Sequence, residues 1–244
     1  MSTRDKTAIV TGGSAGIGAS VCKALLDSGY EVISLARRAG ELGSPKFTHI
    51  TIDLSDQAAT ADVARELARS RPASTIIHNA GAVREKALEE ASLEDLTALF
   101  NLHMAAGFSL VQANLAYMKA QQFGRIVLVS TRAVLGLAKR TAYSSTKAGM
   151  IGMSRTWALE LAPFGITVNT VAPGPIADTE VFHNIIPRDS PKISTIEQSI
   201  PVKRLGKPSD VTRAVMFFAS PDNEFVTGQT LFVCGGTSVG SIVF

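Results

Sequence analysis

The chain contains few of the residues that form disulfide bonds or bind metal ions. Its 244 residues include two cysteines, Cys22 and Cys234, which lie far apart and form no CxxC unit. The histidines are His49, His78, His103 and His183, which are scattered without the spacing of metal ligands. This pattern argues against a disulfide framework and against a zinc site. We therefore expect no bound metal.

Charge of one sign and long hydrophobic runs are also scarce. The net charge is +3, and lysines and arginines never cluster beyond adjacent pairs, so we expect no nucleic-acid partner. No apolar run reaches membrane-spanning length, and the N-terminus lacks the apolar segment of a signal peptide. We expect a cytoplasmic protein that contacts no membrane. With 45% hydrophobic and 18% charged residues, the chain is suited to a large folded core.

Strand-like apolar runs alternate with helical stretches along almost the whole chain. The strand-like runs are 7–12, 31–36, 47–54, 74–81, 124–130, 166–174 and 229–236. The helical stretches are 17–29, 57–70, 93–120, 143–162 and 207–220. Apolar runs without polar alternation, each followed by a helix, indicate a parallel sheet covered on both faces. We predict one α/β domain over residues 1–244, a doubly wound Rossmann-type fold with about seven parallel strands flanked by helices.

The stretch 175–205 differs from the rest, because it is rich in proline, isoleucine and polar residues and shows no clear period. Long segments of this kind in a compact domain are commonly functional. We expect this stretch to close over a substrate as a lid.

A glycine-rich turn, TGGSAGIG at residues 11–18, joins the first strand to the first helix. Glycine permits a tight turn and close backbone approach, and the N-terminus of a helix offers N–H groups and a positive dipole to a pyrophosphate. A plain strand-to-helix turn is the alternative. The position after the first strand favours a dinucleotide site.

The end of the second strand reads LARRAG at residues 35–40, where the adenine ribose of a dinucleotide would lie. Arg37 and Arg38 stand where a carboxylate would repel a 2′-phosphate. Two guanidinium groups can grip a phosphate with paired hydrogen bonds, so we expect NADP(H) in preference to NAD(H). Solvated loop arginines are the alternative.

Tyr143 and Lys147 lie four residues apart in AYSSTKAGM, which puts both side chains on one face of a helix. A neighbouring ammonium favours the phenolate and brings the tyrosine pKa, ordinarily about 10, toward neutral pH. An ordinary pair on a solvated helix face has the same spacing, so the pair alone does not decide.

Seven short motifs follow one another along the chain. They are TGGSAGIG, DLSD at Asp53, HNAG at 78–81, Asn101 in FNLHMAAG, Ser130 in VLVST, Tyr143 with Lys147, and APGPI at 172–176. This set resembles the short-chain dehydrogenase/reductase family, and within it the 3-oxoacyl reductase-like carbonyl reductases. The resemblance runs from about residue 6 to 238, with Tyr143 thirteen residues after Ser130 as is usual in the family.

The resemblance implies hydride transfer between a nicotinamide and a ketone or secondary alcohol by a Ser-Tyr-Lys mechanism. Tyr143 is expected to act as general acid or base, with Lys147 lowering its pKa and binding the nicotinamide ribose. Ser130 is expected to hold the substrate oxygen, and Asn101 a water that links Lys147 to solvent. A strand-end cap for Ser130 and a core amide for Asn101 are the structural alternatives.

The resemblance also implies which residues hold the cofactor. The expected contacts are Gly12, Ser14, Gly16, Ile17, Gly18, Arg37, Arg38, Asp53, Leu54, Asn79, Ala80, Gly81, Tyr143, Lys147, Pro173, Gly174, Ile176 and Thr179. Of these, Asp53 and Leu54 would contact adenine, and Ile176 and Thr179 would close over the nicotinamide.

The sequence leaves the substrate open. The residues expected around it are the apolar Val134, Leu135, Leu137, Phe182 and Ile185, with Arg132 and Arg188 either binding an acid or solvated. Carrier-protein reductases often have basic residues at the site entrance, where this chain has Gln121 and Phe164, with Lys119 nearby. A free ketone and a 3-oxoacyl thioester therefore both stand as substrates.

Two other functions and one assembly state are considered. A dinucleotide-binding sensor without chemistry would not need Ser130, Tyr143 and Lys147 together. An epimerase or dehydratase on the same fold would need room for an extra substrate domain. The resemblance further implies a homotetramer that packs through the helices at about 93–120 and 143–162.

Overall fold

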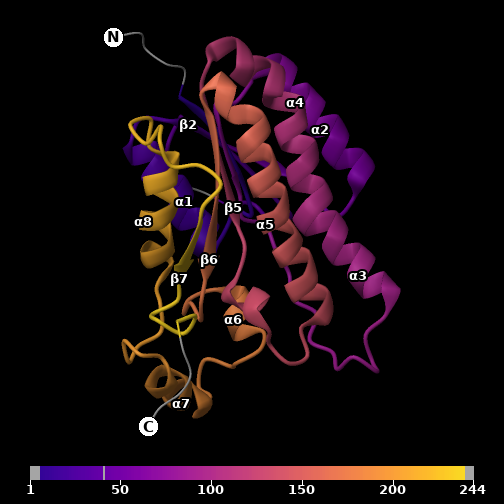
Figure 1. The fold of residues 1–244 in the computed structure, drawn as a ribbon, viewed down its shortest axis with the longest axis vertical. Helices are drawn as coiled ribbons and strands as arrows, with labels where there is room; N and C mark the ends of the chain where they lie inside the picture. The colour runs from indigo at the N-terminus through magenta and orange to yellow at the C-terminus, as the bar shows by residue number, and fades with distance from the viewer. Residues whose placement is uncertain (1–5, 41, 240–244) are drawn as a thin grey trace.

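Seven parallel strands form one sheet in the order β3-β2-β1-β4-β5-β6-β7 (Figure 1). They are β1 Thr7–Thr11, β2 Glu31–Ala36, β3 Phe47–Thr51, β4 Thr75–His78, β5 Gly124–Val129, β6 Ile166–Pro173 and β7 Thr230–Val233. This computed structural model describes residues 6–40 and 42–239, so the two ends of the expected 1–244 domain lie outside the described residues. The predicted doubly wound fold is confirmed.

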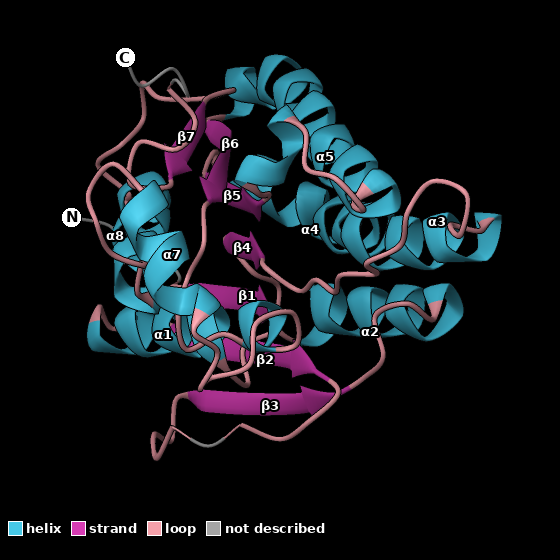
Figure 2. Cartoon of the chain, turned by 90° about the horizontal axis from the view of Figure 1, so that it is seen from below, coloured by secondary structure: helices cyan, strands magenta, loops and turns pink. Residues whose placement is uncertain are grey.

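Helices cover both faces of the sheet, as Figure 2 shows in a view from below. One layer holds α1 Gly16–Asp27 and α8 Pro208–Ala219, and the other holds α2 Gln57–Ser70, α4 Ala106–Gln121 and α5 Thr141–Leu161. Each layer buries its own apolar cluster against the sheet. Both faces of the strands are therefore apolar, which accounts for the runs without polar alternation.

The long helical stretch expected at 93–120 is divided. It consists of α3 Leu93–Phe100, a π-helical turn at Asn101–Ala105 and α4. In the turn the Ala106 N–H donates to the Asn101 carbonyl, five residues back. By length and composition alone, Leu93–Gln121 is apolar enough to cross a membrane, but α4 packs on α2 and β5 as a core helix does.

The expected lid contains more regular structure than its composition indicates. Two short helices, α6 Glu180–His183 and α7 Lys192–Ser199, lie beyond the carboxyl ends of the strands, at the bottom of Figure 1. The first begins because the Thr179 hydroxyl accepts a hydrogen bond from the Phe182 N–H at 3.3 Å.

The order of the strands fixes where a ligand would bind. After β1 the chain builds β2 and β3 on one side, and then crosses to β4 on the other side of β1. The connections that follow β1 and β4 diverge, which opens a crevice at the carboxyl ends of these two strands. The glycine-rich turn and the HNAG motif both come directly after these ends.

Candidate functional site

The turn between β1 and α1 needs its glycines. Gly12 has a φ of +69° and Gly16 a φ of +54°, in the region that side chains with a Cβ rarely adopt. A Cβ added at Gly18 would lie 2.0 Å from the Gly12 carbonyl oxygen. Gly18 therefore permits the close approach of α1 to the turn.

Gly13 permits a second close approach, on the side of the turn that faces the core. A Cβ at this position would lie 2.7 Å from the Cys22 sulfur and 2.5 Å from the Ser34 hydroxyl oxygen. Cys22 is fully buried, and burial raises the pKa of its thiol to about 12. The turn, α1 and β2 are thus packed too tightly for any larger residue.

The N-terminus of α1 fits an anion. In the described chain no side chain caps this helix, and no acidic residue lies in its first turn. Its first N–H groups therefore keep their hydrogen-bonding capacity, and the helix dipole adds positive potential. Because the glycine turn leaves these groups uncovered, the site suits the pyrophosphate of a dinucleotide.

At the end of β2 two arginines and a carboxylate surround the place for an adenosine. Arg37 and Arg38 both line the cavity, and Arg38 Nη2 lies 2.5 Å from Glu180 Oε1 on α6. The Asp53 carboxylate accepts hydrogen bonds from Ser55 N–H at 2.9 Å and Ser55 Oγ at 2.7 Å. These bonds, aided by Arg37, lower the pKa of Asp53 and keep it ionised.

Asn79 joins the ends of β1 and β4. Its Nδ2 donates to the Thr11 carbonyl at 3.1 Å, while the Thr11 hydroxyl accepts from the N–H groups of Asn79 and Ala80 at 3.0 and 2.9 Å. These bonds fix the loop that carries Ala80 and Gly81 against the glycine turn. A structural role of Asn79 is thus visible beside the expected cofactor contact.

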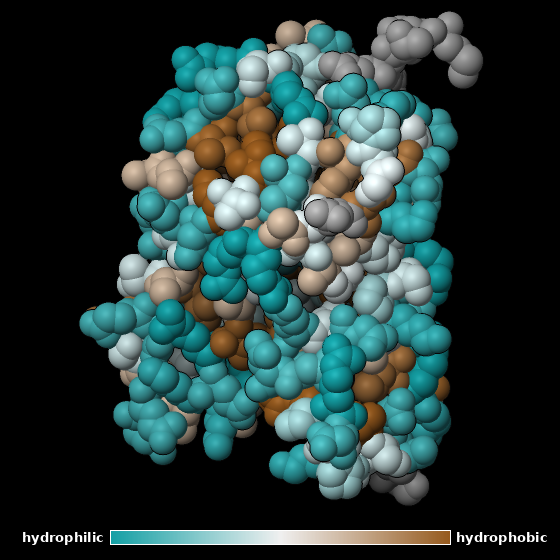
Figure 3. Space-filling view, turned by 180° about the vertical axis from the view of Figure 1, so that it is seen from behind, coloured by the Kyte–Doolittle hydropathy of each residue, from teal (hydrophilic) through white to brown (hydrophobic). Residues whose placement is uncertain are grey.

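A cavity of about 580 Å³ runs from the glycine turn to α5. Figure 3 shows hollows on the back of the molecule, where brown apolar residues lie among teal polar ones. The predicted site residues that line the cavity are Gly12, Ser14, Gly16, Ile17, Arg37, Arg38, Asp53, Leu54, Asn79, Ala80, Gly81, Ser130, Tyr143, Lys147, Pro173, Gly174, Ile176 and Thr179. Among the described residues, the two predicted ones outside this lining are Gly18 and Asn101.

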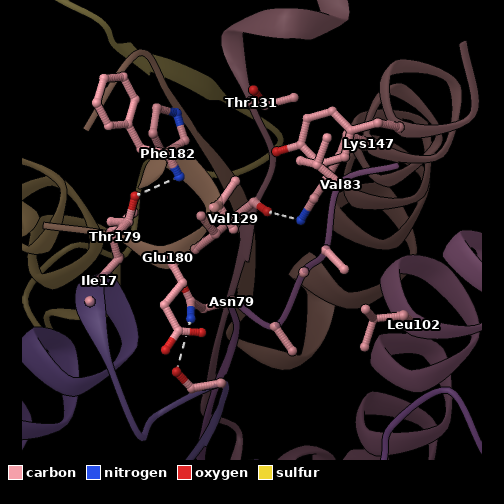
Figure 4. Close-up of a pocket in the computed structure, with 18 of the residues that line it drawn as sticks. Ile17, Asn79, Val83, Leu102, Val129, Thr131, Lys147, Thr179, Glu180 and Phe182 are labelled. Atoms are coloured by element: carbon pink, nitrogen blue, oxygen red, sulfur yellow. Dashed lines mark hydrogen bonds between the residues drawn. The ribbon is translucent and has the colours of Figure 1, made fainter. Parts of the chain in front are cut away.

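Tyr143 and Lys147 of α5 both line the cavity, and Figure 4 labels Lys147. Lys147 is 2% exposed, and burial lowers the pKa of its ammonium to about 7. Its Nζ donates to the Val129 carbonyl at 2.7 Å. The ammonium is therefore aimed at the end of β5, and it titrates near neutral pH.

We expected Lys147 to lower the pKa of Tyr143, but Lys147 is not among the groups that shift this pKa in the structure. Burial raises the pKa of the phenol, opposed by a hydrogen bond from the Thr131 side chain and by the charge of Arg140. The reason is geometric, because the Lys147 ammonium donates to a main-chain carbonyl of β5.

Ser130 and Thr131 end β5 with different partners. The Ser130 hydroxyl donates to the main-chain carbonyl of Lys147 at 2.8 Å, and the residue is 4% exposed. The Thr131 hydroxyl accepts from the Ala133 N–H at 3.1 Å and caps a short 3₁₀ turn. Thr131 is half-buried and lines the cavity together with Tyr143, and its side chain lowers the pKa of that phenol.

Asn101 and His103 lie on different sides of the π-helical turn. The Asn101 amide oxygen accepts a hydrogen bond from Gln57 Nε2 at the surface. His103 is fully buried and points inward. The sequence reading missed His103, although a lone histidine inside an apolar helical stretch signals a side chain with buried polar partners.

The partners of His103 fix its protonation. Its Nε2 accepts from the Ala82 N–H at 3.2 Å, so Nδ1 carries the proton and donates to Thr146 Oγ1 at 2.9 Å. The ring packs edge-on against Tyr143 with 5.7 Å between ring centroids. His103 therefore supports the face of α5 that carries the tyrosine.

His78 continues this buried network to the sheet. Its Nδ1 lies 3.0 Å from Thr11 Oγ1, and its Nε2 donates to the His103 carbonyl at 2.9 Å. Burial, with the charge of Lys147, lowers the pKa of His78 to about 4 and that of His103 well below its usual value. Both imidazoles are neutral at neutral pH, and they tie β1, β4 and the π-helical turn together.

The far end of the cavity is largely apolar. Of the residues expected around a substrate, those that line it are Leu137, Phe182, Ile185 and Arg132. Arg132 Nε donates to the Thr237 carbonyl at 3.2 Å, whereas Arg188 is exposed and lies 3.6 Å from Asp178. Among the described residues, Val134, Leu135 and Arg188 stay outside the cavity lining.

Comparison with known proteins shows which proteins the chain is similar to. Residues 12–238 match the family profile described as enoyl-(acyl carrier protein) reductase. The chain is 35% identical to an acetoacetyl-CoA reductase of Rhizobium meliloti (strain 1021), over 95% of this chain and 98% of the relative. It is 32% identical to the 3-oxoacyl-[acyl-carrier-protein] reductase of Vibrio cholerae, over 97% and 98%.

A solved structure agrees with these relatives in fold. It is the NADPH-dependent reductase YwfH involved in bacilysin biosynthesis, which is 26% identical with a TM-score of 0.86 and covers 98% of this chain and 100% of its own. The glycine turn, the Tyr143–Lys147 helix and the sheet order thus occur together in a chain that matches the family over nearly its whole length. The chain belongs to the short-chain dehydrogenase/reductase family of nicotinamide-dependent oxidoreductases.

Proposed function

We propose that the protein transfers a hydride between NADP(H) and a ketone or secondary alcohol, with Tyr143 as its general acid and base. The observation that carries the proposal is that Tyr143 and Lys147 line the same cavity as the uncapped N-terminus of α1. A dinucleotide held at the glycine turn would extend along this cavity toward the phenol.

The nicotinamide supplies the hydride when it is bound. In reduction, Tyr143 Oη gives its proton to the carbonyl oxygen as the carbon receives the hydride. In alcohol oxidation the phenolate takes that proton back. Lys147 lines this cavity with a pKa of about 7, so its side chain can gain or lose a proton at neutral pH.

The preference for NADP(H) rests on charge at the end of β2. Arg37 and Arg38 line the cavity there, and guanidinium groups bind a 2′-phosphate with charge-assisted hydrogen bonds. The YwfH relative is named as an NADPH-dependent reductase. Asp53 is held by Ser55 in the turn between β3 and α2, and it suits the adenine ring.

A 3-oxoacyl thioester is the favoured substrate class. The acetoacetyl-CoA reductase and 3-oxoacyl-[acyl-carrier-protein] reductase relatives are named for such substrates. The apolar end of the cavity, with Leu137, Phe182 and Ile185, suits an acyl chain. Lys119 Nζ lies 4.4 Å above the ring of Phe164, but both residues lie at the amino ends of β5 and β6 and outside the cavity lining, so this cation is not at the entrance within one subunit.

NADPH oxidation by the purified protein tests the function directly. We expect turnover with 3-oxoacyl thioesters of coenzyme A and of carrier protein, or with free ketones, and faster turnover with NADPH than with NADH. Tyr143→Phe should lower kcat by at least about 100-fold, because the proton donor is lost. NADPH binding without turnover of any carbonyl would instead favour the dinucleotide sensor.

A further inference from the structure

The reduced carbonyl oxygen gains negative charge, and one donor besides Tyr143 must stabilise it. The family resemblance assigns this task to Ser130. We propose that Thr131 is the catalytic residue that donates this hydrogen bond, and that Ser130 is structural. This inference rests on the proposed carbonyl reductase function.

Ser130 cannot serve as the donor in the observed arrangement. A serine hydroxyl has one proton, and that of Ser130 is donated to the Lys147 carbonyl at 2.8 Å. The Ser130 N–H is also bonded, to the Val171 carbonyl at 2.8 Å. Both groups fix the end of β5, one to α5 and the other to β6.

Thr131 has the opposite arrangement of donor and acceptor. Its hydroxyl oxygen accepts from the Ala133 N–H at 3.1 Å, which leaves the hydroxyl proton available. That bond caps the 3₁₀ turn at Arg132–Leu135 and holds the hydroxyl in place. The accepted N–H also polarises the hydroxyl, which strengthens it as a donor.

The Thr131 side chain lies at the wall of the reacting position. It lines the same cavity as Tyr143 and Lys147, it lowers the pKa of the phenol, and Figure 4 shows Thr131 and Lys147 around this cavity. A substrate oxygen that accepts the Tyr143 proton must lie beside that phenol. Thr131 then donates to the oxygen in reduction and to the phenolate in oxidation, and keeps its own proton in both directions.

Matched variants separate the two neighbouring hydroxyls. Thr131→Val removes the hydroxyl at nearly constant volume, Thr131→Ser keeps it, and Ser130→Ala removes the adjacent one. With the substrate that the wild-type protein reduces, we expect Thr131→Val to lower kcat by about 100-fold with little change in KM. The kcat of Thr131→Ser should stay within about tenfold of the wild-type value. Ser130→Ala should lower the melting temperature, and it should lower kcat less than Thr131→Val does.

Titration of the phenol gives a readout that does not depend on turnover. Because the Thr131 hydroxyl favours the phenolate, Thr131→Val should raise the pKa of Tyr143. Ultraviolet difference titration of the protein alone, with Tyr143→Phe to identify the signal, measures this shift. Alcohol oxidation should likewise need a higher pH in Thr131→Val, whereas Ser130→Ala should leave the profile in place.

The outcomes distinguish the two proposals. If the wild-type protein reduces no carbonyl compound, the proposed function fails before Thr131 is tested. If the wild type is active and Ser130→Ala loses as much kcat as Thr131→Val, or more, the assignment to Thr131 is overturned while the function stands. An unchanged Tyr143 titration in Thr131→Val would overturn it as well.

Discussion

At the scale of single residues, burial dominates the chemistry of Lys147. The ammonium has a pKa of about 7 in the folded protein and about 10.4 in an unfolded chain, so the unfolded state binds more protons between these values. The free energy of unfolding should therefore rise with pH across that window.

Lys147→Met provides the comparison for this pH dependence. Relative to the variant, the wild type should gain stability from pH 7 to pH 10, by on the order of 4 kcal/mol at most. Urea unfolding of both proteins at several pH values measures the difference. A gap between the two proteins that is constant over this range would contradict a lysine with a lowered pKa.

The buried histidines should matter for stability. His103→Leu removes the acceptor of the half-buried Ala82 N–H and the donor to Thr146, whose hydroxyl keeps its bond to the Ala142 carbonyl. We expect a loss of about 2–4 kcal/mol in urea unfolding. His183→Leu, on the half-buried α6, is the control and should cost less than about 1 kcal/mol.

At the scale of elements, α3 begins at a dense charge cluster. Ser92 and Asp95 form a capping box, and the Asp95 carboxylate is paired with Arg84 and Lys86 at 2.8 Å each. Hydrogen bonds from Lys86 and Arg84 hold the pKa of Asp95 well below its usual range. This residue therefore stabilises the fold above the pKa of the unfolded carboxyl, which is about 4.

Asp95→Asn tests this helix start. At pH 7 we expect a clearly lower melting temperature than in the wild type, because the cap and both ion pairs are weakened. The difference should persist down to about pH 5 and shrink as the pH falls below about 4, since protonation of this carboxyl in the unfolded chain then favours unfolding of the wild type. Thermal unfolding at pH 7, 5 and 3 measures it, and equal differences at all three values would contradict the charge argument.

The sequence predicts elements better than it predicts the direction of side chains. The apolar runs located every strand, but 47–54 and 74–81 extend past β3 and β4, because apolar residues also line the cavity after the strands end. The π-helical turn at Asn101–Ala105 has no signature in hydrophobic period, since its one extra residue alters which side chains face inward.

The same limit explains two site residues. Ser130 and Thr131 both line the cavity, so counting thirteen residues back from Tyr143 cannot show that the Ser130 hydroxyl donates to a main-chain carbonyl while the Thr131 hydroxyl accepts from a main-chain N–H. Likewise, the π-helical turn directs the Asn101 side chain toward Gln57 and the His103 side chain into the core. Gly12 and Gly16 of the glycine turn were predictable because both have a positive φ, which favours glycine over residues with a Cβ.

At the scale of the whole molecule, one ion pair joins the cofactor end to the expected lid. Arg38 after β2 and Glu180 on α6 are 2.5 Å apart, with 62% and 54% of their side chains exposed. A 2′-phosphate bound at Arg38 would compete with this carboxylate. The expected lid and the proposed phosphate site would thus be coupled through the Arg38 guanidinium group.

Glu180→Gln should release Arg38 for the phosphate. We expect NADPH to bind up to about fivefold more tightly while NADH affinity stays the same. The gain is small because an exposed ion pair such as Arg38–Glu180 contributes little free energy. Arg38→Ala should weaken NADPH by about tenfold or more and again spare NADH. Fluorescence titration with both dinucleotides measures these affinities, and equal changes for the two would argue against a phosphate contact.

The expected homotetramer also belongs to this scale. Leu159 on α5 is 82% exposed, and Phe108 on α4 is partly exposed and packs near Trp157 at 6.2 Å between ring centroids. Replacing Leu159 and Phe108 by arginine should shift the mass in sedimentation toward dimers or monomers. Leu135→Arg, which is exposed on the 3₁₀ turn, is the control, and a wild-type monomer would contradict the expectation.

Because Gly13 packs on Cys22, labelling of the Cys22 thiol can report the local separation of α1 from the sheet. A thiol-specific reagent cannot reach a sulfur that is fully buried beneath the glycine turn until α1 separates from the sheet. The labelling rate of Cys22, followed by mass spectrometry after Cys234→Ser, therefore measures how often this region opens. A dinucleotide that closes the turn should slow that rate in proportion to its occupancy, so binding can be quantified with no substrate present.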